Sequence, residues 1–321
     1  MAGTRLMLPS VIAAAALMIV GCAHRPPPPL HSSSLVVQRS AGGFRPLVRA
    51  KVAGHPMTLL VDTGALKSML PSGFARAHNL VTKSSGFDRL TEDSNGNVAQ
   101  LPLLANVPVQ FEGEAKSGTL DFLMIASDAT EEGILAPQDI VRPGWVVVID
   151  IGHEEVRYEE EDAALKRLVG EASPLREVDF HRCLNEGFFD RSHRIVNTNI
   201  NGVSASMLLD TGASRTVLAR NNPALRSMLE VQGYRSTSKG VISTGTILMV
   251  ENVRVLFSEI SFVLPVMVNP TAHSCWQGAL GADVLRHCTL VWGWSSLWSA
   301  CRTPAEPLAA LSTAGATRRR E

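Results

Sequence analysis

The sequence carries no excess charge of either sign: its 321 residues contain 30 basic and 30 acidic side chains. Without a basic surplus there is no electrostatic case for binding nucleic acid or an anionic membrane surface. The sequence also lacks Gly-x-Ser-x-Gly, His-Glu-x-x-His and a glycine-rich phosphate loop. The common motifs of α/β-hydrolases, zinc metallopeptidases and phosphate-binding proteins are therefore missing.

Helical patterns are scarce as well. Sustained helical periodicity is rare, and short aliphatic runs broken by Gly, Pro, Asn and Ser predict β-strands through most of the chain. One helix is expected at residues 160–171, where it would serve as a connector. A hydrophobic content of 45% and a charged content of 19% are typical of a globular protein. The length suffices for two lobes with separate cores.

The N-terminal apolar stretch, Val11–Val20, is too short to span a bilayer comfortably. It follows the basic Arg5 and ends at Ile19-Val20-Gly21-Cys22, which resembles the lipobox of bacterial lipoproteins. The resemblance implies that residues 1–22 are a lipoprotein signal peptide and that Cys22 is lipidated. An ordinary secretory signal with an incidental cysteine is the alternative.

Residues 23–43 are predicted to form an extended, flexible tether, because four prolines are followed closely by three serines. Folded structure is expected to begin near Phe44. Ala23, rather than Asp, follows the lipobox cysteine, and resemblance to lipoprotein sorting in Gram-negative bacteria then implies the outer membrane. The expected location is the cell envelope, lipid-anchored on the periplasmic face of the outer membrane.

The remaining cysteines all lie in the second half of the chain: Cys183, Cys275, Cys288 and Cys301. Export would place them in an oxidising compartment, so we expect one or two disulfides bracing that half, with three pairings open. Histidines lie beside three of these cysteines, but their spacing fits no zinc finger or metalloprotease pattern. No metal or cofactor is expected.

The most informative feature is a repeated tetrapeptide, Asp62-Thr63-Gly64-Ala65 and Asp210-Thr211-Gly212-Ala213, preceded each time by an aliphatic run. A shift of 148 residues superposes residues 46–70 on residues 194–218 without a gap, and eight of the 25 positions are identical. Similar segments recur downstream, at residues 133–140 and 278–285. The pattern indicates an internal duplication, in which each half supplies one acidic turn.

Two equivalent acidic turns can meet across an internal pseudo-twofold axis. Carboxyls at about 3 Å from each other share one proton, because both cannot ionise side by side. Such a pair can activate a water molecule to attack a peptide carbonyl. If Asp62 and Asp210 were only polar turn residues, two matched copies in the same frame would be a coincidence.

These residues resemble the aspartic protease family in its retropepsin-like and pepsin-like forms. Each repeated tetrapeptide matches the family's hydrophobic-hydrophobic-Asp-Thr-Gly element, and Ala279-Leu280-Gly281 matches its later hydrophobic-hydrophobic-Gly element. The resemblance implies an all-β, bilobal fold and an aspartic endopeptidase that hydrolyses peptides or proteins. It also implies roles for the repeated residues: Asp62 and Asp210 catalytic, Thr63 and Thr211 hydrogen-bonded across the lobes, Gly64 and Gly212 in tight turns, and Ala65 and Ala213 as in retroviral enzymes.

The expected organisation is an N-terminal lobe at residues 44–160, a connector at 161–190, a C-terminal lobe at 191–300 and a tail at 301–321. Because both repeats lie in one chain, we expect a monomer. Ala65 and Ala213 stand where pepsin-like enzymes carry a hydroxyl donor to the carboxylate, so we expect an activity optimum from mildly acidic to near neutral pH.

Two departures from the family pattern leave alternatives open. Ala136 stands where the family has Gly, and neither Tyr158 nor Tyr234 occupies the position of a pepsin-like flap tyrosine. Residues 86–100 and 237–246 are the flap candidates. The chain could instead be an inactive, protease-like peptide-binding or structural lipoprotein. A disulfide-braced β-sandwich adhesion module is a third reading, which would place the two acids far apart.

Overall fold

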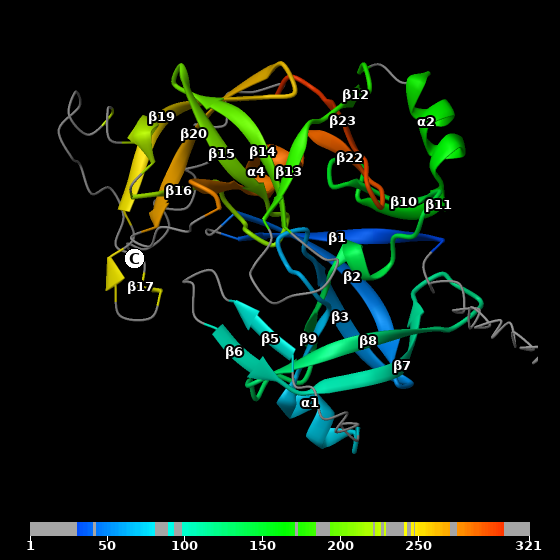
Figure 1. Ribbon diagram of the computed structural model, residues 1–321. Coiled ribbons are helices and arrows are strands. Elements are labelled where there is room, and N and C mark those ends of the chain that lie inside the picture. The colour runs from blue at the N-terminus through cyan, green and yellow to red at the C-terminus, as the bar shows by residue number, and fades with distance from the viewer. Residues whose placement is uncertain are drawn as a thin grey trace, which may run out of the picture.

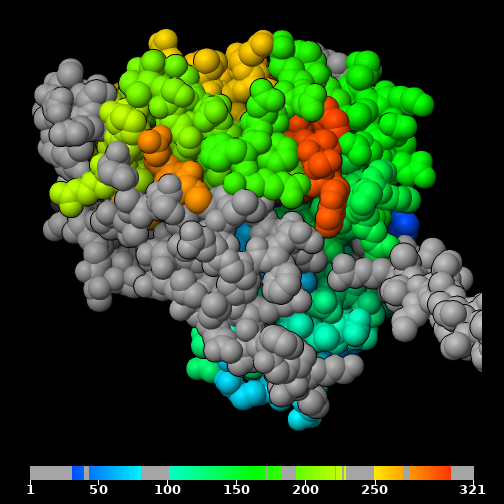
Figure 2. Space-filling view, viewed as in Figure 1, coloured from blue at the N-terminus to red at the C-terminus, as the bar shows by residue number. Residues whose placement is uncertain are grey.

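The computed structural model contains two closed β-barrels that meet at a shared sheet (Figure 1). In the space-filling view the cyan atoms of the first lobe and the lime to orange atoms of the second lobe occupy opposite ends of the molecule (Figure 2). The structure describes residues 31–40, 43–80, 89–92, 98–170, 173–183, 193–220, 222–225, 228, 241–242, 245–246, 248–269 and 275–304.

The first barrel forms because its strands alternate buried and exposed residues and close on themselves through the pairing of β2 with β7. Val48, Val52 and Val109 on these two strands are completely buried in the core. The strands follow the order β2 (Gly43–Val52), β3 (His55–Val61), β9 (Glu132–Leu135), β4 (Met69–Pro71), β8 (Gly118–Ile125) and β7 (Leu103–Phe111). The short helix α1 (Ser72–Ala77) follows β4 and buries Phe74.

The second barrel repeats this arrangement strand for strand. The order is β14 (His193–Ile200), β15 (Val203–Leu209), β21 (Gly278–Leu280), β16 (Val217–Ala219), β20 (Ile260–Asn269) and β19 (Leu248–Phe257), closed by β14 with β19. The parallel pair of β3 with β9 corresponds to that of β15 with β21. The duplication seen in the sequence is therefore a duplication of whole barrels, and the expectation of an all-β bilobal fold is confirmed.

The two halves share one sheet, in which β10 of the first half pairs antiparallel with β22 of the second. Its order is β12 (Arg176–Glu177), β23 (Leu297–Cys301), β22 (Cys288–Trp292), β10 (Trp145–Asp150), β11 (Glu155–Glu160) and β1 (Ser32–Ser40). Helix α2 (Glu161–Val169) packs Ala164 and Leu168 onto Val148 and Val291 of this sheet. It is the connecting helix that was expected, and it lies against the joint between the halves.

The boundary predicted for the tether is wrong. Residues 32–40 form β1, which pairs first with β11 and then, from Leu35 onward, with β2. Ser33 and Leu35 are buried while Val36 is exposed, so the segment alternates as a strand does. The serines were interpreted as flexible, but a strand holds small polar residues well when both of its edges have partners.

The predicted connector at residues 161–190 also contains strands of the second half. β12 pairs with β23 and β13 (Phe180–Cys183) pairs with β14, just as the two parts of β1 pair with β11 and β2. The repeat thus extends to the segment that precedes each barrel. The predicted tail boundary shifts as well, because Cys301 ends β23.

A disulfide links Cys288 to Cys301 at paired positions of β22 and β23, so it braces the shared sheet rather than the second barrel. Cys275 is disulfide-bonded too. The predicted signal peptide, the lipidation site Cys22 and most of the predicted tail lie outside the described residues. Within the part that the structure describes, no helix is long and apolar enough to cross a membrane.

Candidate active site

The two acidic turns leave their barrels at equivalent points. β3 ends at Val61 and pairs there with Leu135 of β9 in parallel register, whereas β15 ends at Leu209 and pairs with Leu280 of β21. The next residue in each case donates its backbone N–H across the pair: Asp62 N to Leu135 O at 3.0 Å and Asp210 N to Leu280 O at 3.0 Å. Each acid therefore begins a turn whose entry is fixed by a buried strand pair.

The two turns are joined to each other by their threonines. Thr63 Oγ1 donates to Leu209 O at 2.8 Å and accepts from Thr211 N at 3.0 Å. Thr211 Oγ1 donates to Val61 O at 2.6 Å and accepts from Thr63 N at 3.1 Å. Both side chains are completely buried. These four bonds link the lobes at residues 148 positions apart and hold the acidic turns against each other.

The structure brings Asp62 and Asp210 together, with a hydrogen bond between their side chains. Asp62 Oδ1 accepts from Gly64 N at 2.8 Å and Ala65 N at 3.0 Å. Asp210 Oδ1 accepts from Ala213 N at 2.8 Å. Backbone donors thus orient both carboxyls, as turns of this kind do without any side-chain hydroxyl.

Gly64 and Gly212 lie beneath the carboxylates, where a Cβ was expected to clash. A Cβ on Gly64 would lie 2.6 Å from Cγ of Asp210, and one on Gly212 would lie 2.4 Å from Cγ of Asp62. The structure adds that each clash is with the carboxyl of the opposite lobe, so the close approach of the acids depends on both glycines.

The environment of the pair favours one shared proton. Burial raises the pKa of Asp62 well above its usual value, and the negative charge and hydrogen bond of Asp210 raise it further. Burial also raises the pKa of Asp210, but hydrogen bonds from Ala213, Asp62 and Gly212 act in the opposite direction. The raised pKa values of both acids therefore favour one proton shared by the pair over two ionised carboxylates.

The segments that contain Ala136 and Gly281 support the acidic turns of their lobes in matching ways. Ala136 N donates to Ser68 Oγ at 3.0 Å in the first lobe, and Gly281 N donates to Thr216 Oγ1 at 3.2 Å in the second. Ala136 is completely buried. Its methyl group therefore occupies packed space in the first lobe while its backbone keeps the hydrogen bond of its counterpart.

The two positions differ in the space around them. A Cβ on Gly281 would lie 2.3 Å from the carbonyl carbon of Arg215, whereas the first lobe already holds the methyl of Ala136. We expect Gly281→Ala to destabilise the protein by about 3 kcal/mol or more, the upper end of overpacking costs, because the atoms that its Cβ would meet belong to backbone. Ala136→Gly should cost about 1 kcal/mol, from added chain entropy and a lost methyl. Urea unfolding of both variants tests this difference, and equal costs at the two positions would contradict it.

Sequence reasoning missed the charged support beneath the first turn. Lys67 Nζ lies 2.8 Å from Asp139 Oδ1, and Ser68 N donates to Asp139 Oδ2 at 2.6 Å, with both charged side chains almost fully buried. Asp283 accepts from Thr216 N at 2.9 Å in the second lobe. The sequence does carry a signal, because Lys67 and Arg215 are both basic and each lies five residues after its acid, Asp62 or Asp210.

Gln138, which follows the second element, was also missed. Its side-chain amide donates to Ala65 O, and its side-chain oxygen is buried without a hydrogen-bond partner among the described residues. The contact fixes the backbone of Ala65, whose N–H donates to Asp62. Nothing in the sequence marks this glutamine, because its contact joins residues 73 positions apart.

Both predicted flap segments contain hairpins. β5 (Arg89–Glu92) pairs with β6 (Val98–Leu101), and β17 (Val241–Ile242) pairs with β18 (Gly245–Thr246). Tyr158 is buried and stacks on Trp145 with ring centroids 4.9 Å apart, so it is a core residue. Tyr234 lies outside the described residues. In the described part of the chain, no group of three His, Cys, Asp or Glu side chains is placed to hold a metal ion.

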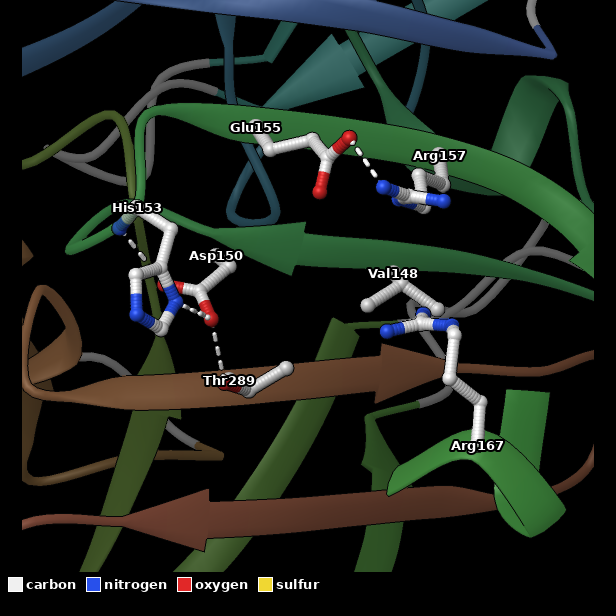
Figure 3. A pocket seen from close by; sticks show the side chains of 7 residues that line it. All are labelled: Val148, Asp150, His153, Glu155, Arg157, Arg167 and Thr289. Atoms are coloured by element: carbon white, nitrogen blue, oxygen red, sulfur yellow. Dashed lines mark hydrogen bonds and ion pairs between the residues drawn. The ribbon is translucent and has the colours of Figure 1, made fainter. Parts of the chain in front are cut away.

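A polar hollow of about 70 Å³ lies on the shared sheet and includes neither acid of the pair (Figure 3). Oδ1 of Asp150 accepts a hydrogen bond from the backbone N–H of His153 at 2.9 Å. Oδ2 of Asp150 lies 2.8 Å from Nδ1 of His153 and accepts a hydrogen bond from Thr289 Oγ1 at 2.5 Å. Burial alone would raise the pKa of Asp150, but the bonds from Thr289 and His153 outweigh it and lower the pKa. Asp150 and Thr289 come from opposite halves, so these contacts join the halves.

Comparisons with known proteins agree with this geometry. A family model described as aspartyl protease matches residues 48–136, which run from β2 through the Asp62 turn to Ala136. No curated protein matches the chain significantly. Among 411 matching solved chains is the crystal structure of an aspartic proteinase from Irpex lacteus. It matches with a TM-score of 0.51 and 11% identity over 88% of this chain and 99% of that chain. The chain thus has the bilobal all-β fold of an aspartic proteinase, and the aspartyl protease model matches much of its first lobe.

Proposed function

We propose that this protein is an aspartic endopeptidase that hydrolyses peptide bonds with a water molecule activated between Asp62 and Asp210. The observation that carries the proposal is the hydrogen-bonded pair of carboxyls, delivered by two equivalent turns and locked by the threonines. A structural role alone gives no reason to bury two acids side by side, because their mutual repulsion opposes folding.

The proposed mechanism uses the single proton that Asp62 and Asp210 share. One acid of the pair, ionised, accepts a proton from the water molecule as the water oxygen attacks the scissile carbonyl carbon. The other acid, protonated, donates its proton to the carbonyl oxygen, which gives a tetrahedral diol. The proton taken from the water then passes to the leaving nitrogen while the second acid recovers its proton from the diol, and the C–N bond breaks. No covalent enzyme intermediate forms.

Among aspartic proteases, the chain is closest in character to the retropepsin-like type. Ala65 and Ala213 follow the two acidic turns, and the described tyrosine is a core residue rather than a flap residue. The two hairpins in the flap segments are suited to close over an extended peptide. Raised pKa values of both acids support an optimum from mildly acidic to near neutral pH.

The proposal extends to the setting of the enzyme. The lipobox-like sequence at Cys22 supports a lipid-anchored protein of the cell envelope, on the periplasmic face of the outer membrane. Because both acids come from one chain, the proposed active unit is a monomer. The alternative of an inactive, protease-like lipoprotein drew on Ala136, but Ala136 makes the same backbone bond as Gly281, which supports the active reading.

The test is cleavage of a denatured protein by the purified full-length chain, followed by mass spectrometry between about pH 4 and about pH 8. Cleavage that pepstatin inhibits is the expected result, since pepstatin occupies the acid pair of aspartic proteases. A chelator and a serine-protease inhibitor should leave the activity unchanged. An absence of cleavage over this pH range, or cleavage that pepstatin does not affect, would contradict the proposal.

A further inference from the structure

The start of β2 reaches from the first half to the loop that follows the acidic turn of the second half. Phe44 N donates to Ser214 O at 3.3 Å. Ser214 directly follows Ala213, whose N–H donates to Asp210. A segment at the start of the fold therefore touches the backbone that orients an acid of the opposite lobe.

Gly43 makes this contact close. Its φ is +122°, a conformation that L-residues rarely adopt, and a Cβ at this position would lie 2.3 Å from Ser214 O. The nearest atoms belong to backbone rather than to a flexible side chain. Any side chain at position 43 would therefore have to displace the loop that follows Asp210.

The same loop is held from its other side by its own lobe. Ala282 N donates to Ala213 O at 2.8 Å, and Gly281 packs directly on the backbone of Arg215. The segment from Ala213 to Arg215 thus lies between Gly43 of the first half and the start of α4 (Ala282–Leu285) of the second. A loop clamped on both sides has little freedom to absorb a displacement.

Phe44 adds a side-chain contact to this clamp. The guanidinium of Arg286, the residue after α4, lies 3.9 Å from the centroid of the Phe44 ring. At this distance the contact is a cation–π interaction between the two halves. The guanidinium of Arg39 lies 5.9 Å from the same ring, so the aromatic face is the common partner of two cations.

We propose that Gly43 and Phe44 are positioning residues for Asp210, acting across the lobe interface through the backbone of Ser214. The inference rests on the proposed function, because it assigns these residues to the geometry of the acid pair. They do not contact the acids themselves. They fix the loop that supplies the Ala213 N–H, and that N–H sets the orientation of the Asp210 carboxyl.

The structure supplies a matched pair of variants. Gly43 and Gly54 begin and follow the same strand, β2, and both have positive φ, +122° and +86°. A Cβ on Gly54 would meet nothing within 4 Å. Gly43→Ala and Gly54→Ala therefore both impose backbone strain, but only Gly43→Ala pushes on Ser214.

We expect Gly43→Ala to lower kcat roughly 10- to 100-fold with KM nearly unchanged, since small displacements of a catalytic group have effects of this size. The titration of Asp210 should shift to higher pH, because its ionised form loses part of the Ala213 hydrogen bond. The charged groups around Asp210 and its loop are Asp62 across the interface and Arg215 with Asp283 beneath. None of these changes in the variant. Gly54→Ala should leave kcat and the titration as in the wild type.

NMR titration of the carboxyl carbons of ¹³C-labelled aspartates measures the shift in the titration of Asp210 directly and does not require the protein to cleave a substrate. If the wild type cleaves no substrate, the proposed function fails, and the titrations of the two glycine variants still decide this inference. Equal titrations and equal kcat values for the two variants would overturn it. If Gly43→Ala does not fold, two variants at position 44 take its place. Phe44→Leu should lower kcat, whereas Phe44→Tyr, which keeps the ring, should leave kcat near the wild-type value. Equal activity of these two would also overturn the inference.

Discussion

Replacement of Asp62 or Asp210 by Asn is expected to abolish peptide hydrolysis, with a loss of at least about 10²–10⁴-fold, the contribution of a positioned acid or base. The fold should survive, because an Asn Oδ1 can accept the same backbone bonds that Gly64 and Ala65 donate to Asp62. Cleavage assays on both variants check this. Asp128→Asn is the control, since its side chain is 98% exposed and should leave the activity intact.

Asp62→Asn should also stabilise the folded protein at neutral pH. The folded-state pKa of Asp62 is raised, chiefly by burial, so the stability it contributes is present below its unfolded pKa and is lost as the pH rises through the folded pKa. Asn cannot ionise and avoids that loss. Urea unfolding should therefore place Asp62→Asn above the wild type at about pH 7, with the difference vanishing near about pH 3. Full activity, or a lower stability at neutral pH, would contradict the assignment of a shared proton.

Loss of a threonine hydroxyl at the lobe interface is expected to have the largest effect on stability. Thr63→Val removes the donor to Leu209 O and the acceptor for Thr211 N, both in a completely buried setting. Each buried polar group left unpaired costs about 1–3 kcal/mol, so a loss of about 2–5 kcal/mol is expected. Activity should fall with it, because the two acidic turns are no longer locked together.

Thr63→Ser is the matched control for this prediction. It keeps the hydroxyl and removes one buried methyl, which should cost about 1 kcal/mol. Thr211→Val should repeat the effect of Thr63→Val, since its hydroxyl makes the equivalent pair of bonds to Val61 and Thr63. Chemical unfolding measures all three variants. A Val variant that is as stable as the Ser variant would show that the four bonds contribute little.

The parts of the fold that could be predicted are those encoded by short sequence segments that occur in both halves of the chain. The acidic turns and the barrel strands around them follow from a segment that repeats at a shift of 148 residues, and the correspondence of Ala136 with Gly281 follows from a second repeat at a shift of 145 residues. The shared sheet could not be predicted in this way. β10 pairs with β22, which lies almost half of the chain length further along the sequence, and no local pattern in either strand identifies the other as its partner.

The errors have physical causes of the same kind. Ser32–Ser34 were interpreted as flexible because composition is a local property, whereas their strand conformation depends on partners at β11, more than a hundred positions away. The need for Gly64 beneath the carboxylates could be expected, but only the structure shows that the carboxyl concerned is that of Asp210, in the other lobe. Local patterns identified the residues, and only their distant partners explain why those residues are needed.

The covalent union of the two barrels lets their sequences diverge independently. In a symmetric pair of identical subunits, any substitution appears on both sides of the axis at once. Here Ala136 in one half corresponds to Gly281 in the other, and Lys67 corresponds to Arg215, so the two halves already differ beneath their acids. Engineering can exploit this freedom, because a change made on one side of the acid pair leaves the other side unchanged.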